Sequence, residues 1–444
     1  MGARLEVTRT LLRELVRAVA SPLHVVGYAL TQTRHRQRGR AALAGATPQG
    51  SDLARFLAAL PRNERGERPP RVFLSAGELS GEAHALELLQ AVEATGLRPQ
   101  WSGFGGTRLA QAGVSLLANL VDHAVMGLLA VFRQLPFFVR CFHAYVAHLD
   151  RCRPDLVVVT DNPGFHMLLA EAAARRGIPV LWFITPQYWA WGPWRMARFR
   201  RAVTGALSIL PFEPACFRPE GVPCDYIGNP LVDRVHAAPP DPAQVRALQA
   251  SPLVALLPGS RRREIDLNLP GLLGVLRRFR ERHPEARVLL PHRDPRRLAQ
   301  IRDLLAAHRA DFVAVVEGQG AEVLSAARVA GVKSGTGSLE ACYHGTPTVI
   351  VYRLVSRLAA FAYHNLLCVP FIGAANLILG RAIVPEVCFL EPAGWDRVLV
   401  ELERLWSDGP ARSQCLADLQ ELRARMGAPG AARRAAAWVV AALR

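Results

Sequence analysis

A short loop in the second half of the chain has the composition of a phosphate-binding turn. An apolar run ends at Leu257 and is followed by Gly259, Ser260 and Arg261. Glycine lets a backbone approach a phosphate, a serine hydroxyl can donate to it, and a guanidinium can bind two of its oxygens. Taken alone, such a loop is more often the solvated start of a helix, so it needs support from the rest of the chain.

A second loop predicts a diphosphate site more strongly. Ser334, Gly335 and Thr336 follow an apolar run and open a helical pattern, directly after Lys333. The free N–H groups and the dipole at a helix N-terminus suit an anion, and the two hydroxyls add donors. Glu340 would lie in the first turns of that helix, where its carboxylate could accept from ribose hydroxyls. Ordinary helix capping is the alternative explanation.

In the first half of the chain, Asp161 directly follows the apolar run 156–160 and is the candidate carboxylate. Alone, an aspartate at this position is more typical of a turn or a helix cap. The glycine turns 76–82 and 103–108 lack dinucleotide and P-loop spacing, which argues against a nicotinamide cofactor or a kinase-type ATP site. The eight cysteines lie at least eight residues apart without a CxxC pair, so neither a zinc site nor a disulfide framework is indicated.

Strands of parallel sheets must position these loops, because the apolar runs are short and end in glycine or proline turns. Between the strands lie helical patterns such as 83–94 and 168–176. The predicted strands are 71–75, 156–160 and 180–184 in the first half, and 253–257, 287–290, 312–316, 329–332 and 348–351 in the second. We therefore expect an α/β protein of two doubly wound, Rossmann-like domains facing one interdomain cleft, with ligands beyond the carboxyl ends of strands.

The predicted domains are a basic extension and linker (1–70), a first Rossmann-like domain (71–235), a second one (243–394) and C-terminal helices (395–444) that could pack back on the first domain. The extension has 12 arginines and 5 acids. Within it, leucines and valines of residues 5–19 recur at helical spacing between arginines. This pattern predicts either a basic amphipathic helix on anionic lipid or an accessory helix packed on the domain.

The 444 residues are 50% hydrophobic with a net charge of +17, which is a globular composition. Lys333 is the only lysine, for which GC-rich codon usage is one explanation. The positive charge favours an anionic partner, and no aromatic-basic motif points to nucleic acid. The sequence predicts neither a signal peptide nor a membrane span, which indicates a cytoplasmic protein.

From about residue 72 to 386 the motifs occur in an order that resembles lipid-A-disaccharide synthase, glycosyltransferase family 19. So many motifs in one order are more specific than any one alone. They are Ala76-Gly77-Glu78, Ser80-Gly81, Gly105-Gly106 with Arg108, Val125-Met126-Gly127, Pro154-Asp155, Asp161 with Pro163, Trp189-Ala190-Trp191, Ile209-Leu210-Pro211-Phe212-Glu213, Leu256-Leu257-Pro258-Gly259-Ser260-Arg261, Ser334-Gly335-Thr336 with Leu339-Glu340, Tyr352-Arg353, and Asn376-Leu377 with Gly380-Arg381.

The resemblance implies a GT-B fold and the transfer of 2,3-diacylglucosamine from UDP to the 6-hydroxyl of 2,3-diacylglucosamine 1-phosphate, giving UDP and a β-1,6 disaccharide. Such transfer inverts the anomeric centre, with Asp161 as the implied base and without a metal or cofactor. The implied UDP-binding residues are Gly259, Ser260, Arg261, Ser334, Gly335, Thr336, Glu340, Asn376 and Arg381. Those implied on the acceptor side are Glu78, Ser80, Glu82 and Met126.

The apolar stretch 125–142 acquires a second interpretation from the resemblance, since both implied substrates carry acyl chains. It could rest on an anionic bilayer at the inner face of the inner membrane of a Gram-negative cell, although a core helix is the alternative. The residues expected to contact lipid are Leu128, Leu129, Phe132, Phe137 and Phe138. Oligomerisation is compatible with the sequence but not required by it.

Five loop residues depart from the pattern of the family: Glu82, Gly164, His166, Asn229 and Lys333. These differences keep two further functions open. One is another GT-B enzyme acting on UDP-N-acetylglucosamine, either a 2-epimerase or a transferase with a different lipid acceptor. The other is a catalytically silent paralogue that binds a nucleotide sugar.

Overall fold

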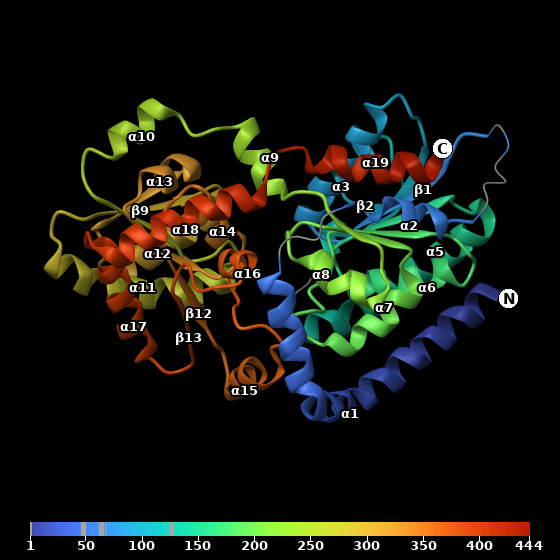
Figure 1. The fold of residues 1–444 in the computed structure, drawn as a ribbon, viewed down its shortest axis with the longest axis horizontal. Coiled ribbons are helices and arrows are strands. Elements are labelled where there is room, and N and C mark those ends of the chain that lie inside the picture. Colours follow the sequence, from blue (N-terminus) through green and yellow to red (C-terminus); the bar gives the residue numbers. More distant parts are fainter. Residues whose placement is uncertain (1, 46–49, 62–65, 67, 124–127) are drawn as a thin grey trace. The chain divides into compact units, whose positions relative to one another are not determined.

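The computed structural model describes residues 2–45, 50–61, 66, 68–123 and 128–444, excluding the side chains of 2, 3, 21–23, 26 and 128–133. The chain forms two compact units (Figure 1). Unit 1 comprises residues 1–230 and 429–444, and unit 2 comprises residues 231–428.

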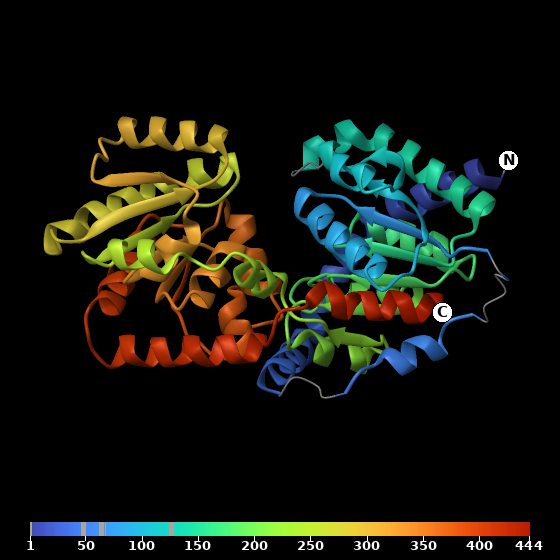
Figure 2. The same cartoon turned by 90° about the horizontal axis from the view of Figure 1, so that it is seen from above.

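Unit 1 contains a seven-stranded parallel sheet in the order β3-β2-β1-β4-β5-β6-β7. The continuous apolar runs of β1 and β4 are buried because helices cover both faces of the sheet (Figure 2). The strand order reverses between β1 and β4. The strands are β1 (Arg71–Ala76), β2 (Gln100–Gly105), β3 (Ser115–Asn119), β4 (Leu156–Thr160), β5 (Val180–Phe183), β6 (Gly205–Ser208) and β7 (Cys224–Tyr226).

The helices of unit 1 include the C-terminal one, which packs on α3. Its Trp438 stacks on Phe56 of α2, with 4.9 Å between the ring centres, and both rings belong to the core. The α-helices are α1 (Gly2–Ala44), α2 (Leu53–Ala58), α3 (Leu79–Glu93), α4 (Thr107–Gln111), α5 (Leu128–Cys152), α6 (Phe165–Ala174), α7 (Met196–Ala202), α8 (Glu213–Phe217) and α19 (Ala431–Leu443). Three 3-10 turns are η1 (Val121–His123), η2 (Pro193–Arg195) and η3 (Arg218–Glu220).

Unit 2 has a six-stranded parallel sheet in the order β10-β9-β8-β11-β12-β13, which reverses between β8 and β11. Its strands are β8 (Leu253–Leu257), β9 (Arg287–His292), β10 (Val313–Glu317), β11 (Val329–Lys333), β12 (Thr348–Arg353) and β13 (Glu386–Phe389). Its helices are α10 (Pro242–Leu248), α11 (Arg262–Arg282), α12 (Pro295–Ala307), α13 (Gly320–Ala326), α14 (Thr336–Tyr343), α15 (Arg357–Leu366), α16 (Ala374–Leu379), α17 (Gly394–Trp406) and α18 (Pro410–Met426), while α9 (Pro230–Ala237) begins at the boundary with unit 1.

Each of the eight strands predicted from the sequence is present, with ends that differ by at most two residues. The expected glycine turn at 103–108 is instead the end of β2 followed by α4. Gly103 pairs with Leu74 of β1, and a side chain at this position would collide with the backbone of Leu74. β2 was missed because glycine weakens the signal of a strand.

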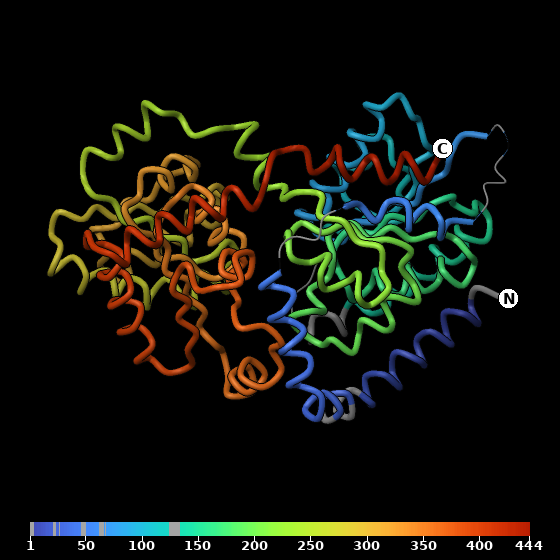
Figure 3. Tube along the Cα trace, viewed as in Figure 1, coloured from blue at the N-terminus to red at the C-terminus, as the bar shows by residue number. Residues whose placement is uncertain are grey.

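The structure also divides the chain differently from the expected domains. The extension 1–70 contributes α1 and α2 to unit 1 rather than forming a separate part. In the region 395–444, α17 and α18 belong to unit 2, whereas only α19 belongs to unit 1. The backbone trace in Figure 3 shows this second passage of the chain into unit 1.

Candidate functional site

In unit 2 a cavity of about 470 Å³ lies at the carboxyl ends of β8 and β11, where the strand order reverses. Open parallel sheets bind ligands at such reversal points, because the loops on either side diverge there. The cavity is lined by both loops that the sequence predicted to bind phosphate. From those loops and α14 come Gly259, Ser260, Arg261, Ser334, Gly335, Thr336 and Glu340.

The two loops are joined by an ion pair between Lys333 and Glu264. The Lys333 ammonium donates to Glu264 Oε1 over 2.9 Å, and the other carboxylate oxygen accepts from the backbone N–H groups of Ser260 (3.1 Å) and Arg261 (3.3 Å). Burial opposes ionisation of Glu264, but the hydrogen bond and charge of Lys333 together with the backbone N–H groups of Arg261 and Ser260 outweigh it and lower the pKa of the carboxyl. An ammonium and two N–H groups therefore already hold one anionic group in this cavity.

Gly259 allows the β8 loop to adopt this shape. Its φ of +125° is in the region that favours glycine, and a Cβ atom would lie 2.6 Å from the Cβ atom of Glu264. Any side chain here would therefore displace Glu264 from the backbone N–H groups that it accepts from.

The cavity has a net positive lining. Its cationic side chains are Arg234, Arg261, Arg293 and Lys333, against the carboxylates of Glu264 and Glu340. Glu340 is paired with Arg234 across 3.2 Å. Thr336 begins α14 in an exposed position and lines the cavity together with Gly337, and the first backbone N–H groups of a helix have no acceptor within it. The lining suits a ligand with a diphosphate.

Asn376 and Arg381, which the resemblance assigned to the nucleotide, do not line this cavity. Asn376 is fully buried, and its amide donates to Val384 O and Glu386 and accepts from two backbone N–H groups. Arg381 donates to Asp418 (2.8 Å) and to Glu421 (2.6 Å) of α18. Their partners lie within the fold of unit 2, so both side chains are structural here.

In unit 1, Asp161 lies directly after β4, where that sheet reverses its strand order. Its φ is +52° and that of Asn162 is +45°, a conformation that residues other than glycine rarely adopt and that is common at functional sites. Burial raises the pKa of Asp161, while a hydrogen bond from the Asn162 backbone and the charge of His84 oppose this shift. A carboxylate with a raised pKa is a stronger base.

The loop after β1 lies against the Asp161 loop. A side chain at Gly77 would collide with the Asn162 amide, so the glycine is needed for this close approach. Glu78 is half-buried before α3, and Ser80 is exposed in its first turn. These two predicted acceptor-side residues therefore lie on the loop that meets the Asp161 loop.

Glu82, by contrast, is buried inside unit 1 and is not available to a ligand. Its carboxylate accepts from the backbone N–H groups of Gly106 (2.8 Å) and Leu109 (3.1 Å). It therefore stabilises the start of α4, and its assignment to the acceptor side was wrong.

The departures from the family pattern lie at structurally distinct places. His166 is fully buried beneath Asp161, and Asn229 donates to the carbonyl of Ile209 over 2.9 Å. Gly164 immediately precedes α6, whereas Lys333 lines the unit 2 cavity.

The predicted lipid-contacting stretch can be assessed only in part. Met126 lies outside the described residues, as do the side chains of Leu128, Leu129 and Phe132. Phe137 and Phe138 are half-buried and pack against His123 and Phe165, respectively. Among the described residues, no helix is both long enough and apolar enough to cross a membrane.

Reasoning from the sequence alone missed several residues of the cavity, among them Arg293, Glu264 and Arg234. Glu264 occupies the third position of α11, where a carboxylate often caps backbone N–H groups, and this was the available signal. Arg234 belongs to α9, far in sequence from Glu340, and no local pattern marks it. In the described part of the chain, no group of three or more histidine, cysteine or acidic side chains could hold a metal ion.

The lipid-A-disaccharide synthetase family profile matches residues 72–396. The lipid-A-disaccharide synthase of Myxococcus xanthus (strain DK1622) is 35% identical over 377 residues, covering 84% of this chain and 97% of the relative. That of Syntrophus aciditrophicus (strain SB) is 33% identical over 376 residues, covering 84% and 98%. Among solved structures, the glycotransferase of kitacinnamycin has a TM-score of 0.55 and 18% identity, covering 85% of this chain and 100% of that one, a likeness that concerns the GT-B fold alone.

Proposed function

Because this chain belongs to the lipid-A-disaccharide synthase family, and is thus a glycosyltransferase that forms the lipid A disaccharide, we propose its substrates and the residues that act on them. The proposed donor is UDP-2,3-diacylglucosamine and the proposed acceptor is 2,3-diacylglucosamine 1-phosphate. The products are UDP and a β-1,6-linked disaccharide. The observation that carries this proposal is the cationic cavity at the strand reversal of unit 2.

Donor binding is assigned to unit 2. The diphosphate would be held by the backbone N–H groups at the start of α14, with Arg261 and the hydroxyls of Ser260, Ser334 and Thr336 as further donors. Glu340 would accept from the ribose. This assignment is supported by the positive lining of the cavity and by its volume, which is in the range of small-ligand sites.

Acceptor activation is assigned to Asp161 of unit 1. Its carboxylate would take the proton from the 6-hydroxyl as that oxygen forms a bond to C1 of the donor sugar. The bond between C1 and the diphosphate oxygen breaks on the opposite face, and the electron pair leaves with UDP. The raised pKa of Asp161 and its place at the reversal point of the sheet support this role.

Stabilisation of the leaving group is assigned to cations of the unit 2 cavity. Negative charge grows on the diphosphate as the bond to C1 breaks, so a fixed positive charge lowers the barrier. Arg261 is the cation predicted for this role. Lys333 adds a second cation, which was not among the predicted binding residues. Arg381 is not included, because it does not line the cavity and its guanidinium binds Asp418 and Glu421 of α18.

We also propose that the protein works peripherally on the inner face of the inner membrane. The acyl chains of the proposed substrates and the net charge of +17 support contact with an anionic bilayer.

The reaction can be tested by following UDP release from the purified chain in detergent. The proposal predicts release that requires both acylated substrates and proceeds without added metal. Equal UDP release without the acceptor, or from UDP-N-acetylglucosamine, would contradict it.

A further inference from the structure

Helix α1 has an inner face that packs on the rest of unit 1. Val7 and Thr10 are buried on this face, and the helix packs against α5 and α8 (Figure 1). Glu6 accepts from Arg176 (2.7 Å) and Arg175 (2.6 Å) of unit 1, which lowers the pKa of its carboxyl. Further along, Arg198 donates to Glu14 over 2.8 Å. α1 is therefore held in place on unit 1 along this face.

The opposite face of α1 is apolar and exposed. Leu12, Leu15, Val16 and Val19 follow the i, i+3, i+4, i+7 spacing of one helical stripe. Leu15 exposes 62% of its surface and Val19 exposes 74%. Since each residue of an α-helix advances by about 100°, this stripe points away from the side that carries Val7 and Thr10. Large apolar side chains that line up in solvent indicate an interaction surface.

The charges of α1 are divided between its two faces. Glu6 and Glu14, its only acidic residues, both pair with arginines of unit 1. The exposed arginines Arg4, Arg9 and Arg13 flank the apolar stripe instead. The outward surface therefore combines apolar side chains with positive charge and has no carboxylate. Such a surface is complementary to an anionic bilayer, into which the apolar side chains insert while the arginines remain at the headgroups.

We propose that this outer face of α1, formed by Leu12, Leu15, Val16 and Val19 with the flanking Arg4, Arg9 and Arg13, docks flat on the surface of an anionic membrane. The inner face of α1 holds the helix on the rest of unit 1 through the buried residues and ion pairs described above. The proposal deepens the membrane association proposed for this enzyme by naming the element responsible. It does not depend on the roles assigned to Asp161 or to the unit 2 cavity.

Vesicle flotation of the full chain tests this proposal. We expect the chain to float with vesicles of phosphatidylethanolamine and phosphatidylglycerol but not with phosphatidylcholine alone, and binding should weaken as salt is raised. The variant Leu12→Gln/Leu15→Gln/Val16→Gln/Val19→Gln should bind the anionic vesicles at least about tenfold more weakly, because it removes the inserting groups. Arg9→Gln/Arg13→Gln should lose part of the preference for anionic lipid.

The matched control is Val400→Gln/Leu416→Gln, which makes the same change at exposed helical positions of unit 2. It should bind vesicles like the unchanged chain. Turnover of detergent-dispersed substrates and the thermal unfolding midpoint should be the same for all variants, which separates failure of this proposal from failure of the enzyme. The proposal would be overturned if the variant with all four glutamine substitutions bound vesicles as well as the unchanged chain does. If light scattering showed that the same variant is a monomer while the unchanged chain is an oligomer, and vesicle binding stayed the same, the outer face would bind a second copy of the chain instead of a membrane.

Discussion

The Nδ1–H group of His166 donates a hydrogen bond of 2.9 Å to the backbone carbonyl of Asp161. Because a carbonyl only accepts, this contact fixes the tautomer, and Nε2 must then accept from the hydroxyl of Ser75 over 2.8 Å. The buried imidazole thus links β1 to the loop in which Asp161 has a positive φ. His166, a departure from the family pattern, therefore positions the candidate base rather than contacting a substrate.

Replacing Asp161 with asparagine should lower kcat by about 10²- to 10⁴-fold, because the side chain can no longer accept the proton of the acceptor hydroxyl. The Kd for UDP, measured by calorimetry, should stay unchanged, since UDP binding is assigned to unit 2. Asp150→Asn makes the same chemical change at an exposed site of unit 1 and should leave both values unaltered. Equal losses of turnover and UDP affinity in Asp161→Asn would instead indicate a structural role.

Acid should destabilise the protein through His166. Burial lowers the pKa of this imidazole to about 4, from 6.5 in the unfolded chain, so the unfolded state binds more protons between these values. Stability is therefore retained above pH 6.5 and falls as the pH drops towards 4, with a maximum loss of about 3 kcal/mol. Chemical unfolding of the full chain and of His166→Asn, across this pH range, isolates the contribution. Identical pH dependences would contradict the assignment of a neutral buried imidazole.

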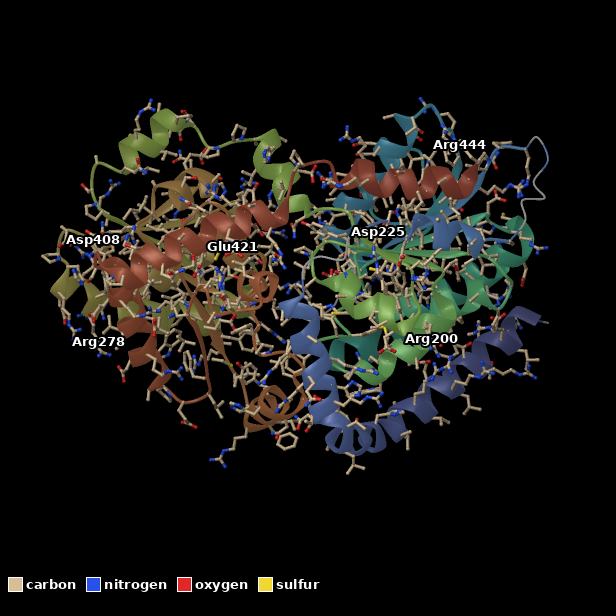
Figure 4. All side chains as sticks on the ribbon, viewed as in Figure 1. Arg200, Asp225, Arg278, Asp408, Glu421 and Arg444 are labelled. Atoms are coloured by element: carbon tan, nitrogen blue, oxygen red, sulfur yellow. The ribbon has the colours of Figure 1, made fainter. Side chains whose placement is uncertain are left out.

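Loss of the Lys333 ammonium should weaken UDP binding. Lys333→Gln removes one cation from the lining of the unit 2 cavity and also the charged partner of Glu264, so we expect about a tenfold rise in the Kd for UDP. Arg278→Gln is the control, because it removes a positive charge from an exposed pair of unit 2 outside the cavity (Figure 4). If both variants bind UDP like the unchanged chain, Lys333 has no part in donor binding.

Arg381 should affect stability rather than the nucleotide. Its guanidinium binds Asp418 and Glu421 of α18, the latter labelled in Figure 4. In Arg381→Gln we expect a UDP affinity within about twofold of the original value and a loss of roughly 1 kcal/mol in stability, since the pair is partly exposed. A large loss of UDP affinity without a change in the unfolding midpoint would restore the role implied by the resemblance.

The strand ends that carry Asp161 and the unit 2 loops could be predicted because buried parallel strands are continuous apolar runs. β4 and β8 have the bounds that the sequence predicted. β2 contains two glycines, β6 begins with one and β7 has only three residues, so their patterns are weaker and they were missed, as were β3 and β13.

The structural roles of Glu82, Asn376 and Arg381 could not be predicted, because a motif gives the position of a side chain but not its partners. Glu82 accepts from N–H groups at residues 106 and 109, and Arg381 pairs with residues 418 and 421. Such contacts between distant parts of the sequence appear only when the chain is folded.

The sequence predicted the apolar pattern of α1 but left open whether it faces lipid or the protein. The helix has apolar residues on two opposite sides, so its apolar pattern does not mark one face. Only the burial of Val7 and Thr10 identifies the side that faces the protein, and thereby the side of Leu12, Leu15 and Val19 that does not.

The most direct test of the central claim is identification of the lipid product made by the purified full chain from UDP-2,3-diacylglucosamine and 2,3-diacylglucosamine 1-phosphate. Mass spectrometry would give its composition, and NMR would give its linkage. We predict a tetraacylated disaccharide 1-phosphate with a β-1,6 linkage and one UDP released per disaccharide. Recovery of both substrates unchanged from folded protein, or a product with an α linkage, would contradict the account.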